Sequence, residues 1–452
     1  MINEEILSLI GMTGASYYSR ISEWDSWWRG HDRSFHEFSE SGVGGRLVRR
    51  ELYRMNMAKK ICEDWAALLL NDRTSVKISD EAGAQFVRDV FSDTGFMAEA
   101  NRLVEKAFAL GTGAVILRLS GINEIGGKLT ADGEADVSFE FVDAQHIVPI
   151  SVVGGRITEA AFVSGGIMRG EEYTYIETHT LEDDGYVIRN EIYTRENGEL
   201  IKKEADGYAE EIHTHAKVPL FSILTPNIQN NIDQSLGLGV SVFADAVDCL
   251  KGVDLAFNNF CRDIKLGGKK VFINQSLIKR DDCGNVITPD DVAQQLFVTL
   301  GDSDFSDNPM IVEHNPELRS AENAEAVQCQ LNYLSFRCGL GTHHYVFSDT
   351  EGRTRLTAAQ YMGERQDMRQ NITKHQKNVK TFLTGVVRAL LWCAAEIFGI
   401  EADSGASVDV IFDDAYFGDS ETYRSRDLEE VKCGIMTAEE YRDKWIGGNV
   451  NG

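Results

Sequence analysis

The chain has 452 residues, of which 43% are hydrophobic and 26% charged, and 71 acidic residues against 45 basic ones give a net charge of −26. This length is enough for roughly two to four structural units with a sizeable core. No apolar run approaches the roughly 20 residues that a membrane span requires. The longest candidate, Val386–Phe398, is short and amphipathic, and the N-terminus lacks the pattern of a secretory signal. We therefore expect the protein to work in a cytoplasm-like setting without a membrane.

The acidic balance limits which partners the chain can hold. Tight binding of duplex DNA by the chain as a whole is excluded, because phosphates are held by Lys and Arg side chains. Two interpretations stay open: general solubility, and a surface along which DNA passes without adhering. The cysteines show neither a C-x-x-C pair nor zinc-site spacing, and we expect reduced, mostly buried thiols at positions 62, 249, 261, 283, 329, 338, 393 and 433.

The first 120 residues are predicted to be mostly helical. Apolar residues at helical spacing predict a helix over Glu51–Leu70 and a second one around Met97–Leu110, followed by a turn and a strand. Before them, Trp24, Trp27 and Trp28 form a cluster. This cluster would act either as a ligand platform or, as we favour, by packing against the following helix.

Residues 112–220 are predicted to be β structure, because alternating stretches are separated by Gly- and Asp-containing turns. These stretches are Val137–Val142, Glu171–His179, Tyr186–Tyr193 and Ala209–His215. His213 and His215 would lie on the same face of a strand, either as two metal ligands or, as we favour, as an ordinary strand pair.

From Leu238 a heptad-like apolar stripe predicts a long helix that ends at Gly267-Gly268. Next comes a small mixed segment, 269–316, with a strand at Lys270–Ile273, a turn at 281–285, a short helix after Asp290 and a strand near Met310–Glu313. A second helix is predicted from about Ser320 to Leu340. Two helices that bracket a small module predict a hairpin stalk with a tip.

The last region combines a loop with a long helix. Residues 341–354 form a loop rich in histidine and aromatic residues, and one helix is predicted from Arg355 to about Phe398, with bends at Gly363 and Gly385. Between positions 353 and 388, eight Lys and Arg residues against two acids give +6. This is either a solvated face paired with acids elsewhere or a functional basic surface.

Enzyme motifs are absent from the sequence. The segment from Gly121 to Lys128 has the wrong glycine spacing for a phosphate loop, and Gly237-Leu-Gly239 is too weak to indicate a nucleotide site. The adjacent acidic pairs Asp281-Asp282 and Asp413-Asp414 cannot form a metal site alone. We therefore predict that the protein is not an enzyme and has no catalytic residue, metal or cofactor.

A series of weak motifs follows in a fixed order along the chain. They are the Trp-rich segment 24–30, MNMAKKICEDWAALLL at 55–70, FVDAQHIVPI at 141–150, GRITEAAF at 155–162, the stalk, tip, loop and long helix, VDVIFDD at 408–414 and VKCGIMTAEEY at 431–441. In this order they resemble the portal proteins of tailed bacteriophages, in particular the branch found in phages of Gram-positive hosts. The resemblance covers nearly the whole chain.

The resemblance implies an α+β, portal-type subunit with an α/β wing, a two-helix stem, a small α/β clip, a long kinked helix and a short helical crown. The implied divisions are wing 1–236, stem helix 237–266, clip 267–316, stem helix 317–340, tunnel loop 341–354, long kinked helix 355–399, wing return strand 400–420 and crown 421–452. The implied function is a ring, typically of twelve subunits, at one capsid vertex, through which double-stranded DNA is packaged and ejected. Such a protein is built into the virion after assembly in the host cytoplasm. Another ring-forming connector or baseplate component is the alternative.

Two groups of residues are expected to carry this function. The tunnel loop would line the channel through His343, His344, Tyr345, Val346, Phe347, Arg353 and Arg355, where the arginines contact phosphates and the aromatics either grip the duplex, seal against neighbouring subunits or pack into the wing. The clip would dock partners through Lys269, Lys270, Lys279 and Arg280. The implied partners are further copies of the chain, the terminase large subunit, a head–tail adaptor, and the major capsid and scaffolding proteins.

Overall fold

The structure is a computed structural model of the chain. It describes residues 2–41, 46–125, 128–168, 170–204, 209–268, 270–274, 296–299, 311–347, 358–412, 427–433, 437 and 441–442. The chain divides into two compact units. We call Met1–Arg29, Ala58–Ala244 and Thr357–Gly452 the sheet unit, and Gly30–Met57 and Asp245–Leu356 the hairpin unit.

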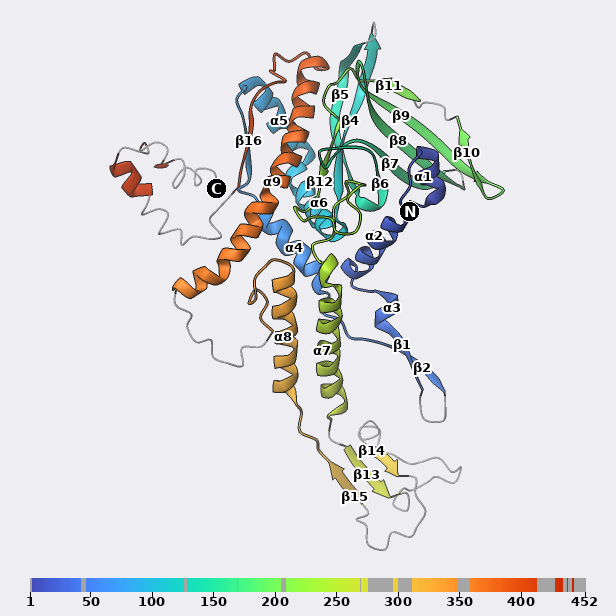
Figure 1. Ribbon diagram of the computed structural model, residues 1–452, viewed down its shortest axis with the longest axis vertical. Helices are drawn as coiled ribbons and strands as arrows, with labels where there is room; N and C mark the ends of the chain where they lie inside the picture. Colours follow the sequence, from blue (N-terminus) through green and yellow to red (C-terminus); the bar gives the residue numbers. More distant parts are fainter. Residues whose placement is uncertain are drawn as a thin grey trace. The chain divides into compact units, whose positions relative to one another are not determined.

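The sheet unit begins with helices, and most of its strands follow (Figure 1). The helices before the first long strand are α1 (Glu4–Ile10), α2 (Ala15–Trp28), α4 (Met57–Leu69), α5 (Glu81–Thr94) and α6 (Phe96–Leu110), with strand β3 (Ser75–Ile78) between α4 and α5. Asp80 caps the start of α5 by accepting a hydrogen bond from the Gly83 amide at 2.7 Å, and Gly111 ends α6 in the left-handed conformation at φ 86°. The predicted helix at Met97–Leu110 is confirmed.

Two sheets form the centre of this unit. Their strands are β4 (Gly113–Ile125), β5 (Lys128–Asp143), β6 (Ile147–Val153), β7 (Arg156–Met168), β8 (Glu171–Glu182), β9 (Gly185–Glu196), β10 (Glu199–Lys203), β11 (Glu211–His213) and β12 (Phe221–Leu224), with a 3₁₀ turn at Ala144–His146. One sheet has the order β12-β4-β5, and the other has the order β10-β9-β8-β7-β6 with β11 paired to β9. All neighbouring strands in both sheets are antiparallel. The predicted β region is confirmed.

The core lies where side chains of both sheets meet. Ile116 and Val142 from the first sheet pack with Ile147, Phe162 and Tyr186 from the second. The single long helix α9 (Ala358–Glu396) lies against β12, and its axis changes direction along its length (Figure 1). Strand β16 (Val408–Ile411) pairs antiparallel with β3.

Gly385, one of the predicted bending points, permits close packing between α9 and β12. A Cβ at this position would lie 2.6 Å from Oγ of Ser222. The Ser222 hydroxyl in turn donates a 2.8 Å hydrogen bond to the carbonyl of Phe382 on α9. A larger residue than glycine would push the helix away from the strand.

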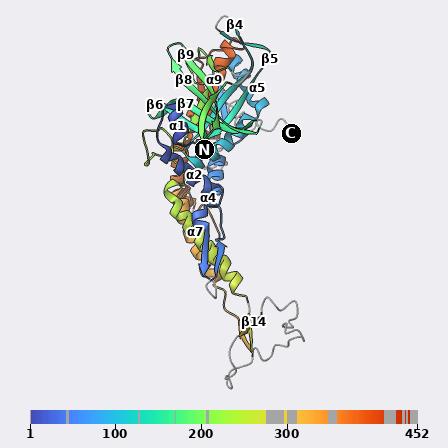
Figure 2. The ribbon, with the colours of Figure 1, turned by 90° about the vertical axis from the view of Figure 1, so that its right-hand side faces the viewer.

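The described part of the hairpin unit contains two long helices, a short helical turn and two small sheets. Helix α7 and strand β14 of this unit are labelled in Figure 2. Its elements are α3 (Arg33–His36), β1 (Glu37–Ser41), β2 (Leu47–Glu51), α7 (Val247–Leu266), β13 (Lys270–Asn274), β14 (Leu296–Thr299), β15 (Ile311–His314) and α8 (Ser320–Arg337), with a 3₁₀ turn at Ala244–Ala246 at the junction of the two units. The predicted strands at Lys270–Ile273 and near Met310–Glu313 and the predicted second helix are confirmed. Strand β14 was not predicted, and the turn at 281–285 and the helix after Asp290 lie outside the described residues. Segment Gly30–Met57, which the predicted wing includes, belongs by its contacts to this unit.

Two helix starts differ from the prediction. The helix predicted from Glu51 begins at Met57, after Asn56, which adopts a left-handed φ of 55°. The helix predicted from Leu238 begins at Val247. Residues 238–243 are buried but not helical, because a Cβ on Gly239 would lie 2.3 Å from the Gly111 carbonyl and the Val242 amide donates to Phe108. Periodicity alone cannot distinguish a buried extended segment from a buried helix.

The tryptophan cluster packs against a helix. Trp24 and Trp27 on α2 are buried, and α2 contacts α6. The Trp28 ring lies 4.1 Å from Nζ of Lys106 on α6, and its Nε1 donates to Glu105 at 3.0 Å. The packing interpretation is confirmed: α2 packs on α6, and Nζ of Lys59 on α4, the predicted following helix, lies 5.3 Å from the centre of the Trp28 ring.

Candidate functional site

Helices α7 and α8 form the antiparallel hairpin that carries the candidate site. At one end Asp263 accepts a 3.0 Å hydrogen bond from the Arg319 amide, and at the other end Arg337 donates at 2.9 Å to the carbonyl of Asp245. Midway, Gly252 leaves room for the side chain of Gln330. The two helices therefore touch along most of their length.

This hairpin leaves large apolar side chains exposed. On α8, Tyr333 and Phe336 have relative exposures of 57% and 55%. Exposed apolar residues on and beside α7 are Leu255, Ile264, Leu266 and Leu318. Tyr333 and Phe336 lie three residues apart on one face of α8, and exposed apolar surface of this kind marks an interaction site.

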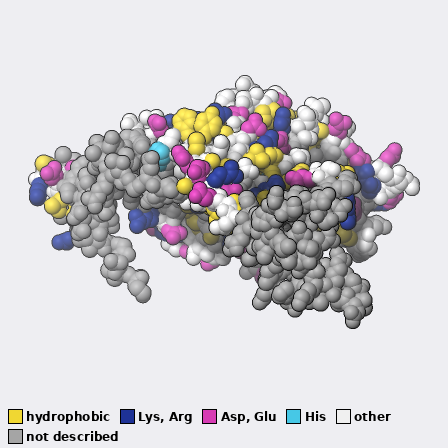
Figure 3. All heavy atoms as spheres, turned by 90° about the horizontal axis from the view of Figure 1, so that it is seen from below, with side chains coloured by type: hydrophobic (Ala, Val, Ile, Leu, Met, Phe, Trp, Pro, Cys, Tyr) yellow, Lys and Arg dark blue, Asp and Glu magenta, His cyan; other side chains and the backbone are white. Residues whose placement is uncertain are grey.

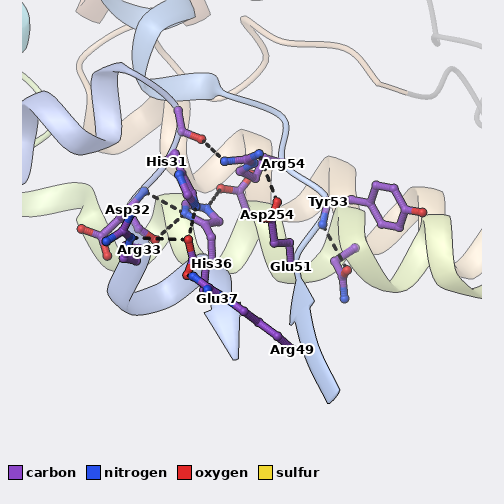
Figure 4. Close-up of polar contacts among 12 residues, drawn as sticks. His31, Asp32, Arg33, His36, Glu37, Arg49, Glu51, Tyr53, Arg54 and Asp254 are labelled. Atoms are coloured by element: carbon purple, nitrogen blue, oxygen red, sulfur yellow. Dashed lines mark hydrogen bonds and ion pairs between the residues drawn. The ribbon is translucent and has the colours of Figure 1, made fainter. Parts of the chain in front are cut away.

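An arm, residues 30–57, is anchored on α7 through two buried polar side chains (Figure 4). Asp254 accepts a 2.8 Å hydrogen bond from the Met55 amide and lies 3.1 Å from Nε2 of His36. One helical turn further on, Asn258 accepts from the Tyr53 amide at 3.2 Å. Because the contacts involve the backbone, they fix the path of the arm and not only its side chains.

His36 is the buried centre of this anchor. Its Nδ1 lies 2.9 Å from both the amide nitrogen and the carbonyl oxygen of Asp32, and its Nε2 lies 3.1 Å from Oδ2 of Asp254. Burial raises the pKa of Asp254, and the Met55 amide, His36 and Arg54 offset this only in part. Sequence reasoning missed this anchor, although the acidic Asp254 within the apolar stripe of α7 was a signal for it.

The described part of the predicted tunnel loop is held against the same hairpin. Gln328 on α8 donates to the Tyr345 carbonyl at 2.8 Å and accepts from the Phe347 amide at 2.7 Å. The Phe347 ring packs edge-on against Phe260 of α7, with centroids 5.5 Å apart. Phe347 therefore anchors the loop within the hairpin unit.

The other predicted channel residues in the described part of the loop are His343, His344, Tyr345 and Val346. Val346 is half exposed, and the ring of His344 stacks edge-on against Tyr345. His343 lies in the same described segment. Arg353 and Arg355 lie outside the described residues.

The tip is a three-stranded sheet in the order β14-β13-β15. Lys270 begins β13, opposite His314 of β15. Lys269, Lys279 and Arg280 lie outside the described residues, and the basic cluster stays a prediction.

The basic stretch of the long helix forms one exposed face. Arg369, Lys374, Lys377, Lys380 and Arg388 are exposed on α9, and Lys380 pairs with Asp409 beside β16. On the inner face His375 packs against Trp65 and Phe108, and burial lowers its pKa to about 3. Unlike the basic face of α9, the face of the molecule shown in Figure 3 has acidic and basic side chains interspersed.

The histidine pair does not form a metal site. His215 has left the strand with a left-handed φ of 57° and pairs with Asp184, whereas His213 lies 3.5 Å from Glu211. Across the described parts of the chain, no group of three or more His, Cys, Asp or Glu residues is placed to hold a metal. Of the described cysteines, Cys62, Cys338 and Cys393 are buried, Cys249 and Cys261 are half-buried, and Cys329 and Cys433 are exposed. The expectation of mostly buried thiols is therefore wrong for the described cysteines. Among the helices that the structure describes, none is long and apolar enough to cross a membrane.

Comparison with known proteins gives one family match. Residues 15–334 match the family described as "Phage portal protein, SPP1 Gp6-like". No curated protein sequence matches the chain. Among solved structures, a chain from the "Neck of native GTA particle computed with C12 symmetry" aligns at 9% identity and a TM-score of 0.37, over 85% of this chain and 88% of that chain.

Proposed function

Because the chain belongs to the SPP1 Gp6-like phage portal protein family, we propose that it forms a ring at one vertex of a phage capsid and that double-stranded DNA passes through this ring. The family match over residues 15–334 carries this proposal. The protein acts as a structural channel and not as an enzyme. That the protein belongs to a phage of a Gram-positive host stays a prediction.

The hairpin unit supports a ring of identical subunits, with twelve copies as the expected number. A single subunit leaves Tyr333, Phe336 and Leu255 exposed, and a second copy of the chain would cover them. Repeated head-to-tail contacts of this kind close into a ring when the rotation between neighbours permits it. In this proposal α7 and α8 are the stem, β13–β15 belong to the clip, and α9 is the long kinked helix.

The charge distribution supports passage of DNA without adhesion. A net charge of −26 per chain repels phosphates over most of the surface. Residues 343–355 form the constriction in this proposal, and Arg353 and Arg355 supply a few phosphate contacts per subunit. Contacts of this kind are sequence-independent, as sliding of the duplex requires.

The ring docks successive partners during assembly. We assign the terminase large subunit and then a head–tail adaptor to the clip, through Lys269, Lys270, Lys279 and Arg280, and the capsid and scaffolding proteins to the outer surface. Opposite-charge steering by this basic cluster on an otherwise acidic protein is the physical reason. Reversal of these four charges is expected to weaken terminase binding while leaving the ring intact, as measured by pull-down with purified rings.

A loop deletion tests the channel assignment. Removal of residues 343–350 is expected to leave ring assembly intact and to impair packaging or retention of DNA in assembled particles. A matched variant that replaces 343–347 with Gly and Ser residues of equal number separates the effect of loop length from that of the side chains. Normal packaging and retention of a full genome by the deletion variant would contradict the assignment.

A further inference from the structure

The arm ends in a two-stranded ribbon, one face of which the described part of the same chain leaves uncovered. Strands β1 and β2 pair only with each other, and every residue of β2 is exposed. Leu47 has a relative exposure of 71%, and Val48 beside it is also exposed. A two-stranded ribbon is marginally stable in water by itself. The ribbon therefore needs a surface to pack against.

The charged side chains of the ribbon form ion pairs in which the arginine is more exposed than the glutamate. Arg49 pairs with Glu37 and Arg50 with Glu40 at 2.5 Å. The side chain of Glu37 is only 12% exposed, whereas that of Arg49 is 69% exposed. Arg49 therefore lies on the outer face of the ribbon together with Leu47. Arg50 and Glu40 lie on the other face, where Glu40 also pairs with Arg262 of α7 at 3.7 Å.

The arm and α8 lie on opposite sides of α7. Gly252 and Asp263 face α8, whereas Asp254 and Asn258 face the arm. At about 100° per residue, positions 252 and 254 point about 200° apart around the helix. The ribbon of one subunit thus projects away from its own α8, as a head-to-tail contact with a second copy requires.

The outer face of α8 matches the ribbon in chemistry and in length. Its exposed stripe runs from Glu322 and Glu325 through Cys329 to Tyr333 and Phe336. Leu47 and Arg49, which share one face of β2, lie about 7 Å apart along the strand. An extended Arg49 side chain is long enough to span the rest of the roughly 12 Å between Tyr333 and Glu325 along α8. An acidic end and an aromatic end on α8 correspond to a basic end and an apolar end on β2.

We propose that the arm of one subunit packs on the outer face of α8 of the next copy in the ring. Leu47 covers Tyr333, and Arg49, on the same face of β2, lies opposite Glu325. The His36–Asp254 anchor fixes the direction in which the ribbon leaves its own subunit. This inference rests on the proposed ring and names the contact that links its neighbours.

Chemical crosslinking of assembled rings tests the contact. The mass of the wild-type assembly is measured first, because failure to form a ring would overturn the proposed function together with this inference. In rings of the Leu47→Cys variant, a short bis-maleimide is expected to join the introduced thiol to the native Cys329 of the next subunit and to give a ladder of multimers in denaturing gels. A crosslink within one chain cannot produce such a ladder. The same variant with Cys329→Ser is expected to lose the ladder, and Leu181→Cys, at a similarly exposed strand position of the sheet unit, is expected to give none.

Intact rings of the Leu47→Cys variant without a ladder, or with a ladder that persists after Cys329→Ser, would overturn the inference while leaving the proposed function standing. Charge reversal gives an independent readout. Arg49→Glu and Glu325→Arg are each expected to weaken subunit association roughly tenfold, and their combination is expected to restore it. If the arginine variant instead leaves association unchanged and weakens DNA retention, the arm contacts nucleic acid and the inference is wrong.

Discussion

The two units of the chain differ in how completely they bury their large apolar side chains. The sheet unit buries Trp65, Phe108, Phe243 and Phe382 completely, between two sheets and the helices that pack on them. The hairpin unit buries one seam between α7 and α8 and leaves aromatic residues on the outside. The first has a core of its own, and the second has a surface that a further copy of the chain would complete. The difference predicts that substitutions in the sheet unit affect folding and that those in the hairpin unit affect assembly.

The largest effect on folding is expected in the sheet unit. Phe382→Ala removes a fully buried ring on α9 and should lower the free energy of unfolding by about 3–5 kcal/mol, through lost burial and the cavity left behind. Denaturant unfolding measures this change. Leu181→Ala, at an exposed position of the same unit, should change the value by less than about 0.5 kcal/mol. Equal losses in the two variants would contradict the assignment of this core.

A smaller effect in the same unit depends on pH. Burial would raise the pKa of Glu177, but hydrogen bonding and charge from His179, together with Arg118, outweigh it and lower the pKa to about 2. A depressed carboxyl pKa stabilises the folded state above the ordinary value of 4.5, and this stabilisation is lost as the pH falls from there through about 2. The loss is on the order of 3 kcal/mol. Glu177→Gln should flatten this part of the pH profile of unfolding, and an unchanged profile would show that the network does not stabilise the fold.

In the hairpin unit, the arm anchor should have a local effect. Asp254→Ala leaves the Met55 amide and His36 without their buried acceptor, which costs about 1–3 kcal/mol. Faster hydrogen exchange at the amides of Tyr53 and Met55, with unchanged exchange in the sheet unit, is the expected result. Asp248→Ala, at an exposed position of the same helix, is the control.

The raised pKa of Asp254 gives the opposite pH dependence from Glu177. A carboxyl whose pKa is higher when folded stabilises the anchor most below its ordinary value of 3.8, and this contribution is lost as the pH rises through the folded pKa. The protection factor of the Met55 amide, which is corrected for the intrinsic pH dependence of exchange, should therefore fall over that rise. Asp254→Asn, which cannot ionise, should abolish the dependence. A profile that the asparagine variant leaves unchanged would assign the titration to another group.

The smallest effect on folding is expected at the exposed aromatics of α8. Tyr333→Ser/Phe336→Ser should change the free energy of unfolding of an isolated subunit by less than about 0.5 kcal/mol, because both side chains are already exposed. The same variant should fail to form rings at concentrations where the wild type assembles, as measured by light scattering. Normal assembly of this variant would remove these residues from the subunit interface.

Prediction from sequence succeeded where a pattern was long and ended at a clear signal. The helix around Met97–Leu110 ends at Gly111, and the second stalk helix follows its apolar spacing, so both were predicted closely. The arm was not predicted, because β1 and β2 are short, charged and without clean alternation. Its anchor depends on a contact between positions more than two hundred residues apart, His36 and Asp254, which local patterns do not encode.

For the candidate site, the sequence predicted the loop between two long helices but not what holds it. The aromatic residues were expected to grip DNA, seal against a neighbour or pack, and the structure packs Phe347 against α7. Gln328 fixes the loop backbone through both ends of its amide, a role that its residue type and position do not reveal. Side-chain partners across a helix hairpin depend on the register of the two helices, and that register is a tertiary property.

The mass of the purified protein in solution tests the ring most directly. Twelve copies of a 50.4 kDa chain would give an assembly of about 600 kDa. Light scattering at micromolar concentration and physiological salt is expected to show one species near that mass, with electron-microscopy averages that contain a central channel. A monodisperse 50.4 kDa monomer under these conditions would contradict the ring.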